Sequence, residues 1–320
     1  MYVYVMGRGH SGSTILDILL GNAAAIESVG ELVSGMANPD HVCSCGATLA
    51  DCPFWSRVRA GVEGTGTDYW ALAHASRKQA HISRLPAVAL ARPGADPDLD
   101  QLARGTAALA DAIRTVAGKP HVLDSGKELT RALFLLRFVP GTRVIHLVRD
   151  PRGVVASLHW RLANGQGFRF LRRRYRARRA APLFVLLEAV NWMVGNLIAE
   201  AIAWSAPGRV LRVRYEELRD RPVETVTRLG NDLGLPLNDV AERLSRSDGF
   251  AVGHNIGGNY IRHEHVVRFD PQKERRQAAL PGWVAALALL PCWPLMPRYG
   301  YRLHPPPSRS RQENGKASTT

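Results

Sequence analysis

The chain has 320 residues, 46% of them hydrophobic, so it is long enough to bury the core of one large α/β domain or of two domains. Its formal net charge of +14 favours anionic partners such as nucleotides, nucleic acids or acidic membrane surfaces. Only four cysteines occur, three of them close together, which argues against a secreted domain stapled by disulfides.

The start of the chain lacks the pattern of a secretory signal peptide, because no basic segment and apolar core precede a cleavage site. The best candidate for a membrane span, residues 284–296, is short and is interrupted by Pro291 and Pro294. We interpret residues 283–293 as a core helix, although their composition also suits a contact with lipid. The expected location is therefore cytoplasmic.

The first motif is the glycine loop, residues 7–14, which follows the apolar run Tyr2–Met6 and precedes a helical pattern at 15–20. A strand, a loop with three glycines and a helix cradle a phosphate, because the backbone can approach closely and N–H groups point at the anion. The spacing resembles the P-loop pattern G-x-x-x-x-G-K-[ST], but Ser13 stands where that pattern has Lys. We expect a loop that holds a phosphate but acts poorly on a γ-phosphate.

Further β-rich runs alternate with helical patterns along the chain. This alternation predicts an α/β fold, with a doubly wound parallel sheet of P-loop NTPase-like architecture flanked by helices, in a single domain over residues 1–304. Ligands of such sheets bind beyond the carboxyl ends of the strands. The expected strands are Tyr2–Met6, His121–Asp124, Arg143–Val148 and Arg209–Val213, and the clearest helices are 128–138 and 183–204.

Three segments depart from this alternation. Residues 40–118 are interpreted as a helical insertion after the first strand–helix unit, with Gly- and Pro-rich turns and two helical segments. Residues 169–179 carry seven arginines, which predicts a solvated helix or a lid. Residues 305–320 are polar and contain Pro and Ser, which predicts a disordered tail.

A second anion site is predicted after the third strand. Arg149 ends that strand, and Asp150 followed by Pro151 is typical of a helix N-cap and first helical residue. Ser157 follows Arg149 by eight residues, about two helical turns into the next helix. A guanidinium and a hydroxyl so placed can reach one phosphate. The alternative is that Arg149 pairs with Asp150 or caps the helix.

These motifs, in this order, resemble those of sulfotransferases that use 3′-phosphoadenosine 5′-phosphosulfate (PAPS). The glycine loop resembles their 5′-phosphosulfate-binding loop, and Arg149 with Ser157 resembles their 3′-phosphate site. The resemblance covers about residues 1–300 and includes a Tyr-Glu segment and a late glycine loop. The donor-binding residues that it implies are Arg8, Gly9, His10, Ser11, Gly12, Ser13, Thr14, Arg149, Ser157, Tyr215, Gly258, Asn259 and Arg262.

The resemblance also implies catalytic residues. Gly30-Glu31 resembles the Gly-Glu pair of tyrosylprotein and related bacterial sulfotransferases, whose Glu is the catalytic base; without the resemblance, Glu31 would be interpreted as a helix cap. Where the family has Lys or Arg before Ser-Gly, this chain has His10, and Arg8 is the alternative cation. Lys127 follows the second strand and is expected to reach the sulfate or the acceptor, the alternative being a surface lysine.

The sequence therefore predicts a sulfotransferase of the EC 2.8.2 type. It would move a sulfuryl group in line from PAPS to a hydroxyl of a small-molecule, carbohydrate or lipid acceptor, with Glu31 as base and with no metal required. No nucleic-acid partner is expected. A peripheral contact with a membrane is compatible with the sequence, and the sequence does not predict the oligomeric state. The alternatives are a P-loop kinase or NTPase, against which Ser13 speaks, and a basic nucleic-acid-binding protein, suggested by residues 169–179.

Two further patterns allow more than one interpretation. Asp124, at the end of the second strand, could bind Mg²⁺ as in an NTPase; we favour a salt bridge that orients Lys127 or Arg131. Trp192 and Asn196 lie on one face of a long apolar helix, and an aromatic residue there is expected in the core rather than against an adenine.

The cysteine cluster leaves three alternatives. Cys43, Cys45 and Cys52, together with His41, could form a zinc site, a redox-sensitive disulfide or simple buried thiols. Their C-x-C-x6-C spacing differs from the usual paired C-x-x-C, so we assign no metal ligand; the same stretches resemble a feature of bacterial sulfotransferases. His254, before the late glycines, is expected to contact substrate or to cap a turn.

Overall fold

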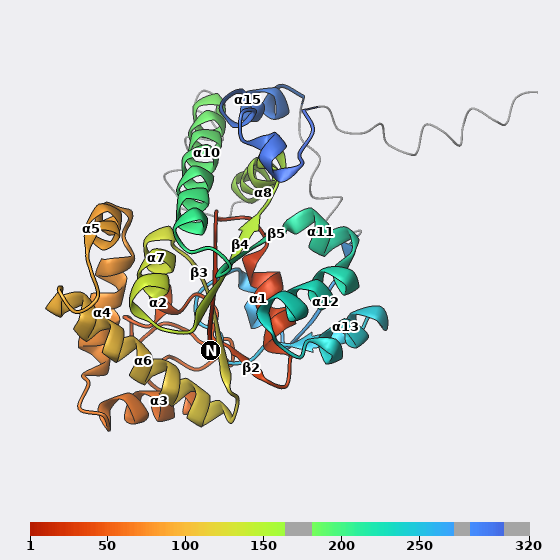
Figure 1. Cartoon of the computed structure of the whole chain (residues 1–320). Helices are drawn as coiled ribbons and strands as arrows, with labels where there is room; N and C mark the ends of the chain where they lie inside the picture. The colour runs from red at the N-terminus through yellow and green to blue at the C-terminus, as the bar shows by residue number, and fades with distance from the viewer. Residues whose placement is uncertain (164–180, 272–281, 304–320) are drawn as a thin grey trace, which may run out of the picture.

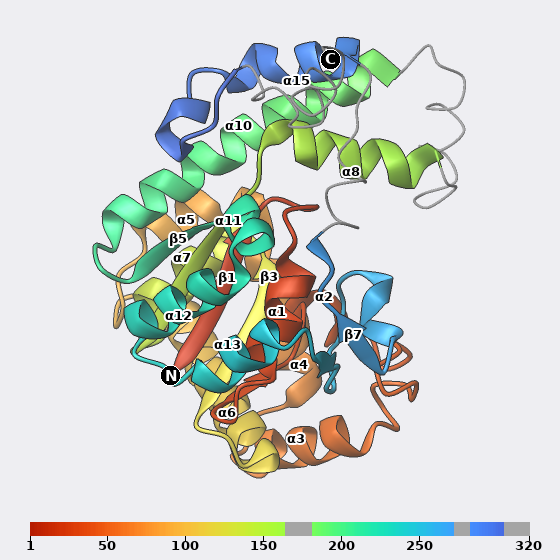
Figure 2. The same ribbon diagram turned by 90° about the vertical axis from the view of Figure 1, so that its right-hand side faces the viewer.

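The computed structural model describes residues 1–163, 181–271 and 282–303. The predicted basic segment at 169–179 and the predicted tail at 305–320 lie outside these residues. A five-stranded sheet occupies the centre of the described chain, and helices cover both of its faces (Figures 1 and 2).

Every neighbouring pair of strands in this sheet is parallel, in the order β2-β3-β1-β4-β5. This confirms the predicted parallel α/β sheet; β2 was not predicted because three residues are too few to show a pattern. Since β1 lies between β3 and β4, the glycine loop emerges at the middle of the carboxyl edge. The strands are β1 (Tyr2–Gly7), β2 (Ile26–Ser28), β3 (His121–Lys127), β4 (Thr142–Val148) and β5 (Val210–Arg214).

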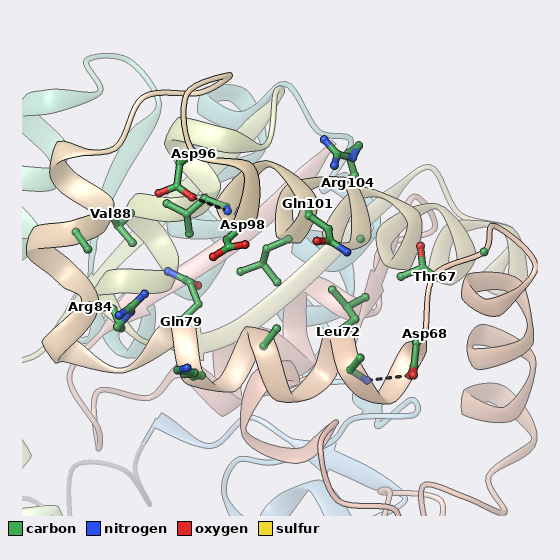
Figure 3. A pocket seen from close by; sticks show the side chains of 18 residues that line it. Thr67, Asp68, Leu72, Gln79, Arg84, Val88, Asp96, Asp98, Gln101 and Arg104 are labelled. Carbon is green, nitrogen blue, oxygen red and sulfur yellow. Dashed lines mark hydrogen bonds between the residues drawn. The ribbon is translucent and has the colours of Figure 1, made fainter.

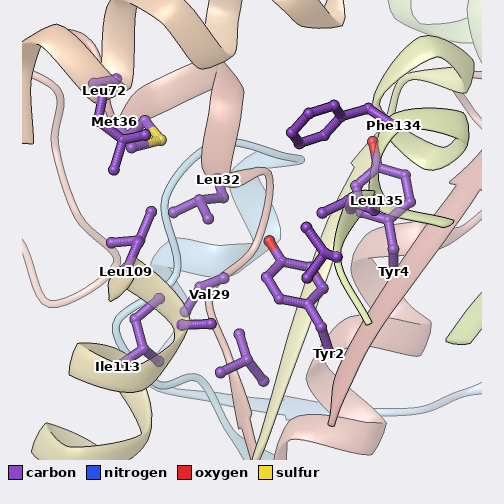
Figure 4. Packing of buried hydrophobic residues seen from close by; sticks show 14 of the residues in the cluster. Tyr2, Tyr4, Val29, Leu32, Met36, Leu72, Leu109, Ile113, Phe134 and Leu135 are labelled. Atoms are coloured by element: carbon purple, nitrogen blue, oxygen red, sulfur yellow. The ribbon is translucent and has the colours of Figure 1, made fainter. Parts of the chain in front are cut away.

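Strand β1 contributes to a hydrophobic core on each face of the sheet, because successive side chains of a strand point in opposite directions. Tyr2, Tyr4 and Met6 enter one core, and Val3 and Val5 enter the other. Figure 4 shows the two tyrosines among the side chains of the first core. Complete burial of one large apolar side chain contributes about 1.5–3 kcal/mol, so the strand that carries the glycine loop is anchored on both sides.

The first core lies under helices α2 to α7, and the second under α1 and α11 to α13 (Figure 1). Helices α1, α7 and α11 each follow a strand of the sheet, as expected, whereas α3 to α6 belong to the insertion. The bounds are α1 (Ser13–Gly21), α2 (Leu32–Gly35), α3 (Pro53–Glu63), α4 (Tyr69–Ala80), α5 (Leu85–Leu90), α6 (Pro97–Ala117), α7 (Leu129–Phe138), α11 (Tyr215–Asp220), α12 (Pro222–Leu233) and α13 (Asn238–Ser245).

The insertion at 40–118 is helical, as predicted, but richer in helices than the sequence indicated. It holds α3, α4, α5, α6 and a 3₁₀ turn, η1 (Ile82–Arg84), where two helical segments were expected. Asp68 and Asp96 each cap the helix that follows, by accepting a hydrogen bond from a backbone N–H of its first turn. Such caps define helix starts even where the apolar pattern is weak.

A third group of elements lies beyond the sheet, at one end of the molecule (Figure 2). Here α10 packs against both α8 and α15.

Two short strands, β6 and β7, form a separate antiparallel pair. The bounds are α8 (Pro151–Ala163), α10 (Ala181–Ser205), α15 (Gly282–Cys292), η2 (Tyr260–His263), η3 (Met296–Tyr299), β6 (Gly249–Ala251) and β7 (Val266–Arg268).

Helix α10 is long and apolar enough over Pro182–Ser205 to cross a membrane, and 33% of its apolar window is buried within the protein. A core helix of a soluble protein passes the same test. The expectation that residues 284–296 are the best candidate is therefore wrong, because α10 is the longer apolar helix. The apolar side chains that α10 exposes recur at helical spacing and form a stripe: Leu183, Leu186, Leu187, Val190, Val194, Leu197 and Trp204.

Helix α15 is buried on one side only. Val284, Ala288 and Cys292 are enclosed, whereas Trp283 and Leu290 are more than half exposed. The interpretation of residues 283–293 as a core helix is therefore correct for one face of α15 and wrong for the other.

Candidate active site

The glycine loop depends on a glycine directly before α1. Gly12 has a φ of +89°, which L-residues with a side chain rarely adopt, and a Cβ atom there would lie 2.3 Å from the ring of Tyr215. No side chain caps the first turn of α1. The N–H groups of Ser13 and Thr14 have no partner within the helix, so they are available to an anion.

Arg149 is fixed beside this loop. Its side chain is 7% exposed, its Nη1 donates a hydrogen bond of 2.8 Å to the carbonyl of His10, and its guanidinium lies 4.3 Å from the centre of the Tyr215 ring. The carbonyl of Arg149 accepts a hydrogen bond from Trp192 Nε1. The predicted place of Trp192 in the core is confirmed, and there it also positions the end of β4.

The alternative pairing of Arg149 with Asp150 does not occur. Asp150 instead forms a salt bridge with Arg152 and accepts a hydrogen bond of 2.8 Å from the backbone N–H of that residue. Helix α8 begins at Pro151. The predicted N-cap and first-turn proline are thus confirmed, and the guanidinium of Arg149 is directed to the glycine loop.

Ser157 and His10 meet between α8 and the glycine loop. Ser157 Oγ lies 3.3 Å from His10 Nδ1. His10 has a φ of +67°, unusual for a residue other than glycine. The structure therefore brings together His10, Gly12, Arg149, Ser157 and Tyr215, which come from four segments of the sequence.

Glu31 and Lys127 form an ion pair at the same edge of the sheet. Glu31 directly precedes α2, Lys127 ends β3, and their side chains are 15% and 22% exposed. Lys127 has a φ of +78°. His10 and Lys127 are thus two of the three residues other than glycine with positive φ in the described chain, and such backbone strain concentrates at functional sites.

A third segment, the late loop (residues 252–259), closes the arrangement. The N–H of Glu31 donates a 2.6 Å hydrogen bond to the carbonyl of Ile256, and the N–H of Asn259 donates one of 3.2 Å to Thr14 Oγ1. A Cβ atom on Gly258 would lie 3.3 Å from Thr14 Oγ1 and 3.5 Å from Glu31 Oε1. The late loop therefore links the glycine loop to Glu31.

Two of the predicted donor-binding cations are engaged elsewhere. Arg8 pairs with Glu188 of α10 at 3.3 Å. Arg262 is buried, and its Nη1 donates hydrogen bonds of 2.9 and 3.2 Å to the carbonyls of Val42 and Asn255. Both residues support neighbouring segments, so neither extends the cluster around His10.

The favoured salt bridge of Asp124 with Lys127 or Arg131 does not form among the described residues, and Lys127 pairs with Glu31 instead. The Asp124 carboxylate accepts hydrogen bonds of 2.8 Å from the hydroxyl of Tyr2 and of 3.0 Å from the N–H of Gly126. Burial raises the pKa of Asp124 to about 6, and the charge of Arg131 opposes this rise. Asp124 thus holds the turn after β3 that carries Lys127.

A buried polar network that the sequence did not reveal supports the late loop. Asp17 Oδ2 accepts hydrogen bonds of 2.5 Å from Ser28 Oγ and of 2.6 Å from Asn255 Nδ2. Burial raises the pKa of Asp17 to about 7. Because Asn255 lies more than two hundred residues beyond Asp17, no local motif marks this contact.

The cysteine cluster converges with a different histidine from the one considered in the sequence. Cys43, Cys45 and Cys52 gather around His254, while His41 Nε2 accepts a 3.1 Å hydrogen bond from the N–H of Gly257. The predicted grouping with His41 is therefore wrong. His41 supports the late loop, and His254, at the start of that loop, takes its place in the cluster.

A separate cavity of about 730 Å³ lies within the insertion, between α4, α5 and α6 (Figure 3). Polar side chains such as Gln79, Asp98 and Arg104 line it together with Leu72. None of the predicted site residues belongs to its lining. The insertion therefore contains a space of its own, apart from the glycine loop.

A family model described as the sulfotransferase family matches residues 3–239 of the chain. Among solved structures, the sulfotransferase domain of the Synechococcus PCC 7002 olefin synthase is similar, with 17% identity, 95% of both chains covered and a TM-score of 0.51. The sulfotransferase domain from the curacin biosynthetic pathway has 16% identity over 94% of this chain and 98% of that chain, with a TM-score of 0.52. No curated protein matches.

The two structural likenesses concern the fold, which is the P-loop NTPase-like arrangement expected from the sequence.

Proposed function

Since the chain belongs to the sulfotransferase family, we propose that it transfers a sulfuryl group from PAPS to a hydroxyl group of an acceptor. One observation carries this proposal: the glycine loop lies between Arg149 and Ser157 on one side and the late loop with Glu31 on the other. Such an arrangement can hold a donor that has two phosphate positions, and it places a proton acceptor next to that donor.

The residues present suit the two anionic ends of PAPS. The N–H groups at the start of α1 would hold the 5′-phosphosulfate, and the absence of a Cβ atom at Gly12 lets the Tyr215 ring pack directly against the loop. Arg149 and Ser157 would hold the 3′-phosphate, because a guanidinium has five N–H donors and His10 takes one of those of Arg149. PAPS supplies the sulfuryl group, bonded to a phosphate oxygen.

The ion pair of Glu31 and Lys127 divides the chemistry between two groups. Glu31 accepts the proton of the acceptor hydroxyl as that oxygen bonds to sulfur and the bond between sulfur and the phosphate oxygen breaks. Lys127 and the N–H groups of the glycine loop stabilise the charge that develops on the phosphate oxygen. Arg8 is paired with Glu188 of α10, whereas Lys127 is paired with the proposed base itself, so we assign the cationic role to His10 and Lys127.

The acceptor belongs to the broad class of hydroxyl compounds: small molecules, carbohydrates or lipids. The apolar stripe on α10 and the exposed tryptophan of α15 support a contact with apolar material, including the peripheral membrane contact expected from the net charge. A cytoplasmic location is part of this proposal.

Differential stabilisation by nucleotides tests the donor. Adenosine 3′,5′-bisphosphate at one hundred times its Kd should stabilise the protein by about 2.7 kcal/mol, measured as a rise in Tm, and ATP with Mg²⁺ should not. Arg149→Ala should reduce the shift, while Arg152→Ala, a neighbouring arginine outside the site, should retain it. Stabilisation by ATP with Mg²⁺ alone would instead support the kinase or NTPase alternative. A mass-spectrometric screen of hydroxyl acceptors with isotopically labelled PAPS then identifies the product.

A further inference from the structure

Four side chains capable of binding a metal converge outside the proposed catalytic residues. Cys43 and Cys45 lie in a turn at the start of the insertion, Cys52 directly precedes α3, and His254 lies in the late loop. Their ligand atoms all lie within 4.8 Å of one another. Two segments separated by some two hundred residues thus contribute to one point.

The measured separations suit a single tetrahedral ion. With Zn–S bonds of about 2.3 Å and Zn–N bonds of about 2.0–2.1 Å, a tetrahedron has S···S edges of about 3.8 Å and S···N edges of about 3.5 Å. Cys45 Sγ lies 3.6 Å from Cys52 Sγ, and His254 Nδ1 lies 3.3 Å from Cys52 Sγ and 3.9 Å from Cys43 Sγ. A disulfide requires about 2.05 Å between its sulfur atoms.

The surrounding contacts hold the ligands in this arrangement. The ring of His254 stacks on Phe54, with centroids 4.9 Å apart and planes 3° from parallel, and its carbonyl accepts a 2.9 Å hydrogen bond from Trp55 Nε1. The N–H of Gly46 donates a 2.9 Å hydrogen bond to the carbonyl of Cys43, which closes a tight turn around the first two cysteines. The positive φ of Gly46 permits that turn.

We propose that Cys43, Cys45, Cys52 and His254 bind one Zn²⁺ ion in a closed structural site. Four protein ligands leave no open position for water or substrate, which distinguishes structural from catalytic zinc. Three thiolates, a neutral imidazole and Zn²⁺ carry a net charge of −1.

Arg262 offers the compensating charge. Its Nη1 donates a hydrogen bond to the carbonyl of Val42, the residue next to Cys43. The same guanidinium group also donates to the carbonyl of Asn255, next to His254. A buried arginine that joins both segments of the cluster is explained by an anionic metal centre between them.

The ion would fasten the late loop to the insertion. His254 lies three residues before Gly257, whose N–H is held by His41. Gly258 and Asn259 then contact Glu31 and Thr14. The metal would therefore determine the position of the loop segment that borders the proposed catalytic base, without itself touching the reactants.

Metal analysis of the intact protein tests this site. Full-length chain purified under reducing conditions without chelator should contain one zinc ion per chain by plasma mass spectrometry. Cys52→Ser and His254→Ala should each lower the zinc content at least tenfold. Two matched controls should retain it: Cys292→Ser, a buried thiol that contacts the carbonyl of Ala189, and His41→Ala.

Cobalt substitution gives a second measurement that does not depend on the variants folding. Wild-type protein stripped of zinc and given Co²⁺ should show thiolate-to-cobalt charge transfer and the intense visible bands of a tetrahedral site. Addition of Zn²⁺ should abolish these bands, and it should return the Tm of the stripped protein to the value measured before zinc was removed. The proposal is overturned if the wild type neither contains zinc nor gives the tetrahedral cobalt spectrum, or if the native chain carries a Cys45–Cys52 disulfide by mass spectrometry. Zinc lost from His41→Ala but kept in His254→Ala would overturn the ligand assignment.

Discussion

The glycine loop and the late loop meet at Thr14, but they are held in place by different means. Backbone elements hold the glycine loop: β1 lies in the middle of the sheet, and α1 begins directly after Gly12. The late loop has backbone hydrogen bonds only at single points, such as Ile256 with Val29 and Glu31. Side chains add the other contacts: Asp17 with Asn255, His41 with Gly257, and His254 with the three cysteines of the proposed zinc site.

This difference suggests that donor binding and turnover depend on different parts of the site. The residues proposed to bind the two phosphates of the donor belong to the regular fold, whereas the segment next to Glu31 depends on groups that can change their protonation and on the proposed zinc ion. Donor binding should therefore be robust, and turnover should be sensitive to conditions. Four predictions test the residues around the glycine loop separately from those around the late loop.

The largest effect is expected from Glu31→Gln. If Glu31 is the base, its removal should lower kcat by about 10²–10⁴-fold while the Kd for adenosine 3′,5′-bisphosphate stays unchanged. Steady-state kinetics and titration calorimetry measure the two quantities. Glu27→Gln is the matched control, because Glu27 is an enclosed carboxylate paired with Lys119 and should not affect kcat. Retained turnover in Glu31→Gln would assign the proton transfer to another group.

The pH dependence of stability should be governed in part by Asp17. Its pKa rises from 3.8 to about 7 on folding, so between these values the folded chain binds more protons than the unfolded one. The free energy of unfolding should therefore fall as pH rises from about 4 to about 7, and then level off. Because a tenfold change in proton affinity corresponds to about 1.4 kcal/mol, the fall attributable to Asp17 is at most about 4 kcal/mol.

Asp17→Asn should flatten this slope in urea unfolding experiments, because the amide still accepts both hydrogen bonds without a charge. Glu128→Gln is a useful comparison, since burial also raises the pKa of Glu128 to about 7. Both variants should flatten the slope, and because the amide of Asp17→Asn keeps both hydrogen bonds, neither should alter proteolytic cleavage within the late loop. An unchanged slope in Asp17→Asn would show that Asp17 is ionised at no cost in the folded chain.

Arg149→Ala should affect donor binding at the glycine loop rather than turnover. Loss of charge-assisted hydrogen bonds should weaken adenosine 3′,5′-bisphosphate binding by about 10–100-fold and leave kcat at saturating donor nearly unchanged. Titration calorimetry of this variant beside Arg152→Ala gives the comparison. Equal losses in the two variants would assign the effect to the general positive charge instead.

The smallest effect is expected from Arg8→Ala. Its ion pair with Glu188 is partly exposed, so it should contribute about 0–1 kcal/mol to stability. Turnover should stay within about threefold of wild type, because the charge of Arg8 is already compensated. His10→Ala should reduce kcat more. The reverse ranking of the two variants would make Arg8 the cationic group of the glycine loop.

The arrangement of the residues proposed to bind phosphate was largely predictable from the sequence. Gly12, Arg149 and Ser157 each follow a recognisable strand, and parallel strands bring their carboxyl ends to one edge. The pattern of Asp150 and Pro151 even indicated where α8 begins. Such residues are positioned by local structure, which the order of the chain records.

The late-loop side could not be predicted in the same way. His41 lies near the cysteines in the sequence, yet His254 joins them in space, because the late loop returns to the insertion. The pairing of Lys127 with Glu31 rather than Asp124 depends on the backbone turn after β3, where Lys127 adopts a positive φ. Contacts across two hundred residues leave no periodic signal in either partner.

The central position of β1 has a consequence for synthesis on the ribosome. Tyr2 is made more than one hundred residues before its partners in the sheet, Val122 and Thr142. At about 5–20 residues per second, the first strand waits about 6–25 s for β3 to be made. During that interval Val3 and Val5 have no neighbouring strand to cover them, so a nascent chain that stalls before β4 would present an aggregation-prone, nucleotide-free segment to chaperones.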